Sequence, residues 1–369
     1  MTNDFPPRPG GIQAFVYALT LRQPPDSVVV YAPAWRGAGR FDEDQPFQVV
    51  RHPGSLMLPV PSVLRRARDV ARAEGCTAVW FGAAAPLGLL GPALGCSGVE
   101  RLVATTHGHE AGWAALPGAR SMLRRVGEGT DVVTYLGEYT RRRISRALTP
   151  AAAGRMVQLT PGVDETMFHP GAGGAEVRAR LGLGGAPVVV CVSRLVPRKG
   201  QDTLVRAWPT VLRAEPEARL LLVGGGPSRA RLERLVDSVG VRGSVVLTGS
   251  VPWTELPAYF DAGDVFAMPC RTRNRGLDVE GLGIVYLEAS ATGLPVVAGD
   301  SGGAPDAVLE GETGYVVDGR SPEAVAHRVG ALLADRDLAA RMGQRGRAWV
   351  EQSWRWDTLA ARLTGLLNA

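Results

Sequence analysis

Two glutamates flank a glycine turn in GLDVEGLGIVYLEASATGLPVV, residues 276–297. Glu280 and Glu288 stand eight positions apart, with Gly281 and Gly283 between them and an apolar helix start after the glycines. A helix rises about 1.5 Å per residue, so Glu288 should lie roughly 9 Å along the helix from the glycine turn. Backbone amides at a helix N-terminus suit a diphosphate, and a carboxylate on each side can accept hydrogen bonds from sugar hydroxyls. The pattern predicts a nucleotide-sugar site, although acidic residues near a helix start are also favoured by the helix dipole alone.

A cluster of cations in VSRLVPRKG, residues 192–200, suits the same ligand. Lys199 is the only lysine among the 41 Lys and Arg residues, so a chain that uses arginine elsewhere has kept the compact ammonium at one place. With Arg194 and Arg198 it follows a predicted strand, and such a cluster can bind an anion with spread charge, such as a diphosphate. The alternative is a solvated basic loop in a chain whose arginine bias reflects a GC-rich genome.

Two other glycine-rich turns differ in what they could bind. In RPGGIQAFVYAL, residues 8–19, Gly10 and Gly11 precede a predicted helix, where free amides could hold a phosphate or the pair could simply make a tight turn. In LLVGGGP, residues 221–227, three adjacent glycines do not form GxGxxG, and no acidic ribose ligand is placed about 20 residues further on. We interpret this second turn as a point where a ligand or backbone approaches closely, and not as a dinucleotide-binding motif.

The elements that must position these residues are short valine-rich runs that alternate with helical patterns. Such runs are typical of parallel strands covered on both faces. Six lie in each half of the chain, at residues 27–33, 47–53, 77–82, 101–108, 131–137, 155–162, 186–195, 218–226, 244–251, 264–270, 294–300 and 313–318. The pattern predicts an α/β protein with two tandem Rossmann-like doubly wound domains that face each other across a cleft, with ligand sites at the carboxyl ends of the strands.

The domain boundaries follow from composition. We expect an N-terminal domain at 1–170, a C-terminal nucleotide-sugar-binding domain at 171–350, and a C-terminal helix at 351–369 that could cross back to the first domain. The Gly- and Ala-rich stretch at 169–187 is interpreted as the interdomain connection.

Composition limits the class of protein further. The chain has 369 residues, 45% of them hydrophobic, a net charge of +5 and no apolar run long enough to span a membrane. Its start has neither the basic nor the apolar region of a signal peptide, which favours a cytoplasmic protein. The four cysteines lack metal-ligand spacing, so we expect no metal site. We also expect no nucleic-acid partner.

The motifs together resemble a known family. The segments that carry the resemblance are EGLGIVYLE, SRLVPRKG, GGIQ and THGHE, and they are similar to those of the retaining GT-B glycosyltransferases of family 4 over nearly the whole chain. The longer segments at 276–308 and 105–114 resemble more closely the phosphatidylinositol mannoside mannosyltransferases of high-GC bacteria. The resemblance implies GDP-mannose as the donor, a phosphatidylinositol mannoside lipid as the acceptor, no metal cofactor, and a peripheral location on the inner face of the cell membrane.

The resemblance also implies roles for individual residues. Glu288 would bind the ribose and Glu280 the transferred sugar, while His107 would face that sugar from the other domain or, alternatively, cap its strand. His109 is less favoured because it lies two positions beyond, and Gln13 is expected to contact the acceptor. The diphosphate would be held by Arg194 and Lys199, aided by Gly10, Gly11 and the amides of Gly281, Leu282, Gly283 and Ile284. Since these cations and amides stabilise the leaving group, a metal is not needed.

Arginines in the first domain suggest how a lipid acceptor is reached. The predicted helix in residues 61–75 combines basic positions with a small apolar stripe, which is typical of binding to anionic lipid surfaces. The basic positions are Arg65, Arg66, Arg68 and Arg72. The alternative is a solvated helix face.

Other functions would need other features. A family member could use another donor base or a soluble acceptor, and a sugar-nucleotide epimerase of the same fold would keep the donor motifs. A nicotinamide dehydrogenase would require GxGxxG after a strand, and a binding protein without activity would normally carry a signal peptide.

The start of the chain carries a separate expectation. MTNDFPPRPGG contains a glycine turn with no strand in front of it, whereas the second half places VVVCVSRL before its ligand loop. We therefore expect an open seam beside residues 2–7, and about 10 further residues in the native protein, enough for one strand and its start.

Overall fold

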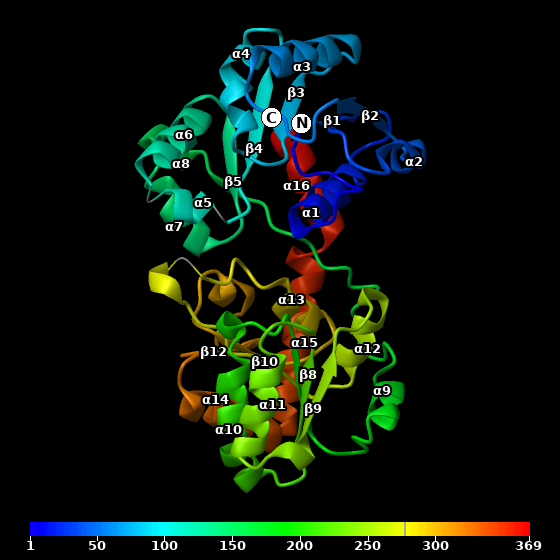
Figure 1. Ribbon diagram of the computed structural model, residues 1–369, viewed down its shortest axis with the longest axis vertical. Helices are drawn as coiled ribbons and strands as arrows, with labels where there is room; N and C mark the ends of the chain where they lie inside the picture. The colour runs from blue at the N-terminus through cyan, green and yellow to red at the C-terminus, as the bar shows by residue number, and fades with distance from the viewer. Residues whose placement is uncertain (109, 115, 277) are drawn as a thin grey trace. The chain divides into compact units, whose positions relative to one another are not determined.

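The computed structural model describes residues 1–108, 110–114, 116–276 and 278–369. They divide into two compact units, the first made of Met1–Pro161 and Trp356–Ala369 and the second of Gly162–Arg355 (Figure 1). In the described part of the chain no helix is long and apolar enough to cross a bilayer.

The second unit is built on one six-stranded parallel sheet with the strand order β12-β11-β10-β7-β8-β9. Its strands are β7 Val188–Val192, β8 Arg219–Val223, β9 Val245–Gly249, β10 Val265–Met268, β11 Val296–Gly299 and β12 Gly314–Val317. Every residue of β7, β10 and β11 is buried, as expected for strands covered on both faces. The strand order reverses between β7 and β10, and such a reversal opens a crevice at the carboxyl ends of the two strands.

Helices of the second unit cover this sheet. They are α9 Gly174–Arg180, α10 Gln201–Ala214, α11 Arg229–Ser238, α12 Leu256–Asp261, α13 Ile284–Ala291, α14 Pro322–Ala334 and α15 Arg336–Ser353. Helix α10 packs against α14, and α13 packs against α15. Trp208 of α10 is fully buried, and its indole nitrogen donates to the Ser244 hydroxyl at 3.0 Å, so this helix is fixed both by packing and by a hydrogen bond.

The Gly- and Ala-rich stretch at 169–187 is part of the second unit and not a free connection between domains. Val177 and Leu183 are buried in its hydrophobic core. The amides of Gly171 and Gly174 donate to the Asp261 carboxylate at 2.7 Å each. The interpretation as a linker was wrong because glycine and alanine here allow close packing against α12, where a Cβ on Gly174 would lie 2.4 Å from the Asp261 backbone.

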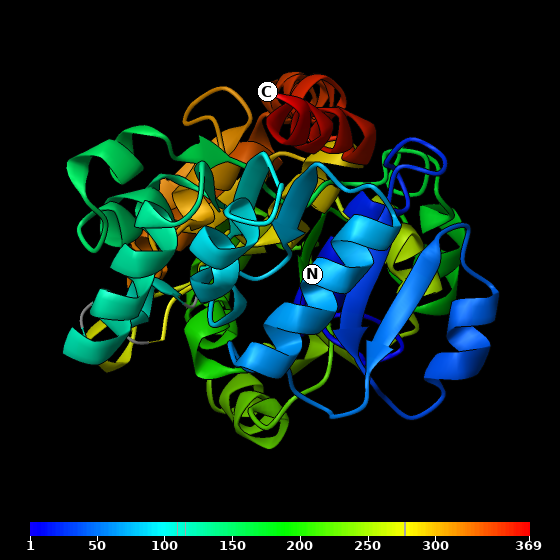
Figure 2. The ribbon, with the colours of Figure 1, turned by 90° about the horizontal axis from the view of Figure 1, so that it is seen from above.

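The first unit has two separate parallel sheets. Strands β1 Val29–Pro33 and β2 Gln48–His52 form one, and β3 Ala78–Phe81, β4 Arg101–Thr105, β5 Val132–Tyr135 and β6 Val157–Gln158 form the other. In Figure 2 the arrows of β1 and β2 lie side by side, with the N-terminus next to them.

Its helices are α1 Gly11–Thr20, α2 Ala38–Glu43, α3 Pro61–Ala73, α4 Gly91–Gly95, α5 Glu110–Trp113, α6 Pro117–Glu128, α7 Glu138–Ser145, α8 Pro150–Gly154 and α16 Trp356–Asn368. The last helix returns from the second unit and packs on α1, β3 and β4. Its buried side chains Leu359 and Leu363 belong to the core around Phe15 and Leu19.

The predicted fold class is confirmed, since each of the twelve predicted strand segments contains one observed strand. The unit boundary falls between Pro161 and Gly162, nine residues before the expected position, because the chain after β6 already pairs with the second unit. The Val163 amide donates to the Trp354 carbonyl at 2.8 Å. The crossing helix begins at Trp356, since residues up to Ser353 still belong to α15.

Candidate active site

Two loops meet at the carboxyl ends of β7 and β10 in the second unit. One follows β7 and carries Lys199, and the other follows β10 and carries Glu280. Gly200 lets them touch, because it has a φ of 77° and a Cβ there would lie 1.8 Å from the Pro269 carbonyl oxygen. Any other residue would be strained at this φ and would push the two loops apart.

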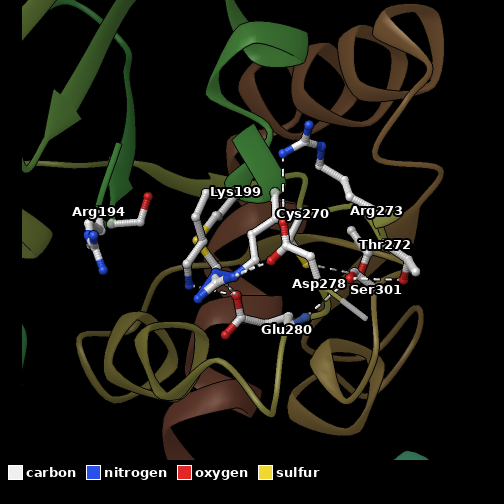
Figure 3. A network of polar contacts seen from close by, with 12 residues as sticks. Arg194, Lys199, Cys270, Thr272, Arg273, Asp278, Glu280 and Ser301 are labelled. Carbon is white, nitrogen blue, oxygen red and sulfur yellow. Dashed lines mark hydrogen bonds and ion pairs between the residues drawn. The ribbon is translucent and has the colours of Figure 1, made fainter. Parts of the chain in front are cut away.

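Lys199 and Glu280 form the centre of the site (Figure 3). The Lys199 Nζ lies 2.6 Å from a Glu280 carboxylate oxygen, and the two residues are only 9% and 7% exposed. Arg198 lies 3.3 Å from the same oxygen and 3.3 Å from the Asp278 carboxylate. Arg273 approaches Asp278 from the other side at 3.7 Å. Two cations therefore share one nearly buried carboxylate, and such a charged cluster is a candidate functional site.

The backbone of Glu280 is also fixed. Its amide donates to the Ser301 hydroxyl at 3.2 Å, and its carbonyl accepts from the Gly303 amide at 2.9 Å. The Ser301 hydroxyl lies 3.1 Å from that of Thr272. Position and orientation of the carboxylate are thus set by the turn after β11 as well as by the cations.

The glycine turn after Glu280 leads into α13 as predicted from its spacing. Gly283 is the N-cap residue with a φ of 79°, and no side chain caps the helix. The Tyr286 hydroxyl donates to the Met268 carbonyl at 2.8 Å and so ties the first turn of α13 to the end of β10. An uncapped helix start with open amides is a common binding place for phosphate groups. Gly281, Leu282 and Ile284 complete this turn.

Glu288 lies on α13, half-buried, one turn beyond this start. Within the described part of the chain its carboxylate makes no hydrogen bond or ion pair. Burial raises its pKa from 4.5 to about 7, and the charge of Lys199 offsets part of that rise. A carboxyl that has lost water without gaining a partner suits a ligand that supplies hydroxyl donors.

Arg194 lies apart from the network in Figure 3, and its side chain is exposed. Its loop packs against the triple glycine, where a Cβ on Gly224 would lie 2.1 Å from the Ser193 carbonyl and a Cβ on Gly226 would lie 2.4 Å from that of Leu195. The triple glycine is therefore needed for backbone packing. Arg194 is left free to reach a ligand but does not contact Lys199 or Glu280.

In the first unit, the candidate residue Gln13 is fixed by a hydrogen bond to a neighbouring side chain, and the candidate glycines lie beside it at the start of α1. The Gln13 side chain is buried and donates to the Asp4 carboxylate at 2.7 Å, and its Oε1 would overlap a Cβ on Gly10 at 2.1 Å. Gly10 and Gly11 are exposed at the start of α1.

His107 follows β4 and is half-buried. Its Nε2 lies 2.6 Å from the Gly82 carbonyl, so this nitrogen carries a proton and donates it. The ring stands edge-on to Phe15 at 5.3 Å, and the His107 amide donates to the Glu110 carboxylate at 2.9 Å. These contacts fix the imidazole at the strand end. His109 lies outside the described residues.

The basic helix α3 has a buried face with Val63 and Val70. Arg65, Arg66 and Arg72 are exposed. Arg68 was wrongly grouped with them, since it turns inward and donates to the Ala93 carbonyl at 2.6 Å. The segment before α3 adds exposed apolar side chains that sequence analysis missed, namely Leu56, Leu58 and Val60, which are 54%, 50% and 39% exposed.

Sequence analysis also missed Asp278 and Arg273 as partners of the central cluster. The charged residues of RTRNRGLDVE were the available signal, but the contact of Asp278 with Arg198 depends on a loop that lies 80 positions earlier in the chain. Of the described residues, no group of three or more His, Cys, Asp or Glu side chains could hold a metal ion.

Comparisons with known proteins define the class. The family model described as Glycosyltransferase Family 4 matches residues 9–166, and the one described as Glycosyl transferases group 1 matches residues 175–349. The crystal structure of Anabaena Alr3699/HepE in complex with UDP shares the fold with a TM-score of 0.79 and 19% identity, covering 100% of this chain and 98% of that one. The chain belongs to the family 4 glycosyltransferases and has the GT-B fold.

Relatives with higher sequence identity to this chain are named as mannosyltransferases. The GDP-mannose-dependent alpha-(1-6)-phosphatidylinositol monomannoside mannosyltransferase of Mycobacterium tuberculosis is 53% identical over 375 residues, which cover 100% of this chain and 97% of that protein. The GDP-mannose-dependent monoacylated alpha-(1-6)-phosphatidylinositol monomannoside mannosyltransferase of Corynebacterium glutamicum is 43% identical, with the same coverage of both chains.

Proposed function

We propose that this enzyme transfers mannose from GDP-mannose to a phosphatidylinositol monomannoside. The observation that carries the proposal is the Lys199–Glu280 pair at the carboxyl ends of β7 and β10, with an uncapped helix start and Glu288 next to it. The similarity to named mannosyltransferases over the whole chain supports the same donor and acceptor.

The donor diphosphate would bind between Lys199 and the start of α13. As the bond between the sugar and the diphosphate breaks, negative charge grows on the diphosphate and positive charge on the sugar ring. The Lys199 ammonium and the first amides of α13 are fixed in the free enzyme, so they stabilise that charge without rearranging. Arg194, whose side chain is exposed, would add a second cation.

The two glutamates would take opposite ends of the donor. Glu280 accepts hydrogen bonds from mannose hydroxyls while it also fixes the Lys199 ammonium. Glu288 accepts from the ribose hydroxyls, and these donors favour its ionised form. Binding should therefore lower the pKa of Glu288 from the value of about 7 that burial produces.

The first unit is proposed to carry the lipid acceptor. Arg65, Arg66 and Arg72 of α3 can attract an anionic bilayer with about 1 kcal/mol per charge near the surface. The exposed Leu56, Leu58 and Val60 beside them could enter the interfacial region. We infer a peripheral enzyme on the cytoplasmic face of the membrane, and retention of configuration as in the family that the sequence resembles.

A transfer assay tests the proposal. Purified enzyme is incubated with radiolabelled GDP-mannose and vesicles that contain phosphatidylinositol monomannoside, and lipid extracts are separated. We expect label in a dimannoside, and little label with UDP-mannose or ADP-mannose as donor. Conversion of GDP-mannose to another sugar nucleotide without labelled lipid would support the epimerase instead.

A further inference from the structure

A pocket of about 470 Å³ opens on the second unit, away from the Lys199–Glu280 pair. Its walls come from the first two turns of α10, the loop after β10 and the turn between β12 and α14. Among the described residues, neither Lys199 nor Glu280 nor Glu288 lines it. The pocket is therefore separate from the proposed donor site.

Positive charge dominates the lining of this pocket. Its charged lining residues are Arg206, Arg271, Arg273, Arg320 and Asp202. The carboxylate already has a partner, since both Asp202 oxygens lie 2.8 Å from the Arg271 guanidinium. Guanidinium groups that three distant segments of the chain bring to one pocket repel one another unless an anion lies between them. The fold thus leaves an excess of positive charge here.

Arg271 is fixed by the surrounding protein. Its guanidinium also donates to the Thr203 hydroxyl at 2.7 Å, and that hydroxyl donates to the Gly319 carbonyl at 2.9 Å. The Arg271 side chain is only 14% exposed. These contacts hold one cation of the pocket in place before any ligand arrives, and a donor fixed in advance loses little conformational entropy on binding.

Arg206 and Arg320 have no such explanation within the fold. Both are exposed, and in the part of the chain that the structure describes neither forms an ion pair. Arg320 donates to the Thr272 carbonyl, which holds its guanidinium beside the loop after β10. An arginine that meets no carboxylate and lines a pocket with other arginines can bind an anion from solution.

Arg273 connects the pocket to the charged cluster around Glu280. Its guanidinium lies 3.7 Å from the Asp278 carboxylate, which lies 3.3 Å from Arg198 on its other side. In Figure 3 Asp278 lies between Arg273 and Glu280. The Arg273–Asp278 separation is longer than the 2.6 Å between Lys199 and Glu280, so Asp278 neutralises the charge of Arg273 only in part.

The side chains that line the pocket indicate which anion it can bind. Guanidinium groups match the geometry of phosphate oxygens and bind them through paired hydrogen bonds. Among the described lining residues only Pro322 lacks a polar side chain, so the pocket offers little apolar surface for a base or an acyl chain. Its volume lies within the range of small-molecule sites.

We propose that this pocket is a second anion site of the enzyme, which binds the phosphate groups of a small soluble molecule such as a sugar phosphate or pyrophosphate. Arg271 is the fixed contact, and Arg206 and Arg320 supply guanidinium groups that have no other counter-ion. The inference is independent of the proposed reaction, because it uses no residue of the proposed donor site.

Calorimetric titration with pyrophosphate tests this anion site. The enzyme is first saturated with GDP, so that the proposed donor site is occupied, and EDTA removes metal ions that would bind the probe. The parent should bind pyrophosphate, and the double variant Arg206→Gln, Arg320→Gln should bind it at least tenfold more weakly. Its melting temperature should stay within a few degrees of the parent, since neither arginine forms an ion pair. The charge-matched variant Arg213→Gln, Arg234→Gln, at exposed positions of the same unit, should bind like the parent.

Equal affinity of the parent and the Arg206→Gln, Arg320→Gln variant, or no binding of pyrophosphate by the parent, would overturn the proposal. So would displacement of pyrophosphate by phosphatidylinositol vesicles and not by glucose 6-phosphate, since the pocket would then bind a lipid headgroup. GDP should bind this double variant and the parent equally. If the parent bound no GDP, the proposed donor would be wrong, and the same comparison of pyrophosphate affinities without GDP would still test the pocket.

Discussion

The Lys199 ammonium lies 2.6 Å from the Glu280 carboxylate, and both side chains are nearly buried. The only lysine in the chain is thus held by the residue proposed to contact the transferred sugar. Removing one partner of a buried ion pair leaves a charge without compensation, which costs roughly 3–5 kcal/mol. Conservative substitutions are therefore better probes of this pair than alanine.

Replacement of Lys199 by arginine should separate charge from shape. The Lys199→Arg variant keeps a cation beside Glu280, but the planar guanidinium cannot place its charge where a compact ammonium does. We expect kcat to fall by at least 100-fold, about 3 kcal/mol in the transition state, with a melting temperature within a few degrees of the parent.

Arg213→Lys, an exposed substitution in the same unit, is the matched control and should leave kcat and the melting temperature unchanged. A fully active Lys199→Arg enzyme would make Lys199 a structural cation only.

Glu288 predicts a pH dependence of stability. Its pKa is raised from 4.5 to about 7, so between these values the folded state binds more protons than the unfolded state. Stability therefore falls as pH rises through this window and levels off above pH 7. Glu288→Gln removes the cost of ionisation, so at pH 8 its free energy of unfolding should exceed that of the parent by about 2–3 kcal/mol, with little difference below pH 4.5.

Urea unfolding at pH 4.5 and pH 8 measures this difference. Glu217→Gln, at an exposed position, should behave like the parent at both pH values. If Glu288→Gln gave the same stability gain at both pH values, packing and not ionisation would be its cause. The variant should also lose donor affinity, because a neutral amide is a weaker acceptor for ribose hydroxyls.

Charges on α3 predict membrane binding. The triple variant Arg65→Gln, Arg66→Gln, Arg72→Gln should bind anionic vesicles at least tenfold more weakly and with a flatter salt dependence. Activity on a soluble short-chain acceptor should persist.

A charge-matched triple variant on the second unit, Arg213→Gln, Arg234→Gln, Arg341→Gln, tests net charge alone and should retain vesicle binding. Equal vesicle binding by both triple variants would leave α3 as a solvated helix face. Arg68→Gln should instead lower thermal stability, because it loses the bond to the Ala93 carbonyl.

The fold was predictable because valine-rich runs and their spacing are local signals, and all twelve contain a strand. Lys199 and Glu280 were predictable for a similar reason, since one is unique in composition and the other stands beside a glycine turn. Their direct pairing was not, because it depends on two loops brought together by the β7–β10 reversal and by the conformation of Gly200. Helical spacing likewise could not show that Arg68 turns inward, because that direction is set by α4.

Calorimetric titration of GDP-mannose tests the central claim that the Lys199–Glu280 cluster is the donor site. The account predicts that Lys199→Gln weakens binding at least 100-fold, while the exposed control Arg213→Gln binds like the parent. Binding by the parent should be the same with excess EDTA, since cations of the chain neutralise the diphosphate. Equal affinity of the parent and Lys199→Gln, or binding that is lost in EDTA and restored by magnesium, would contradict the account.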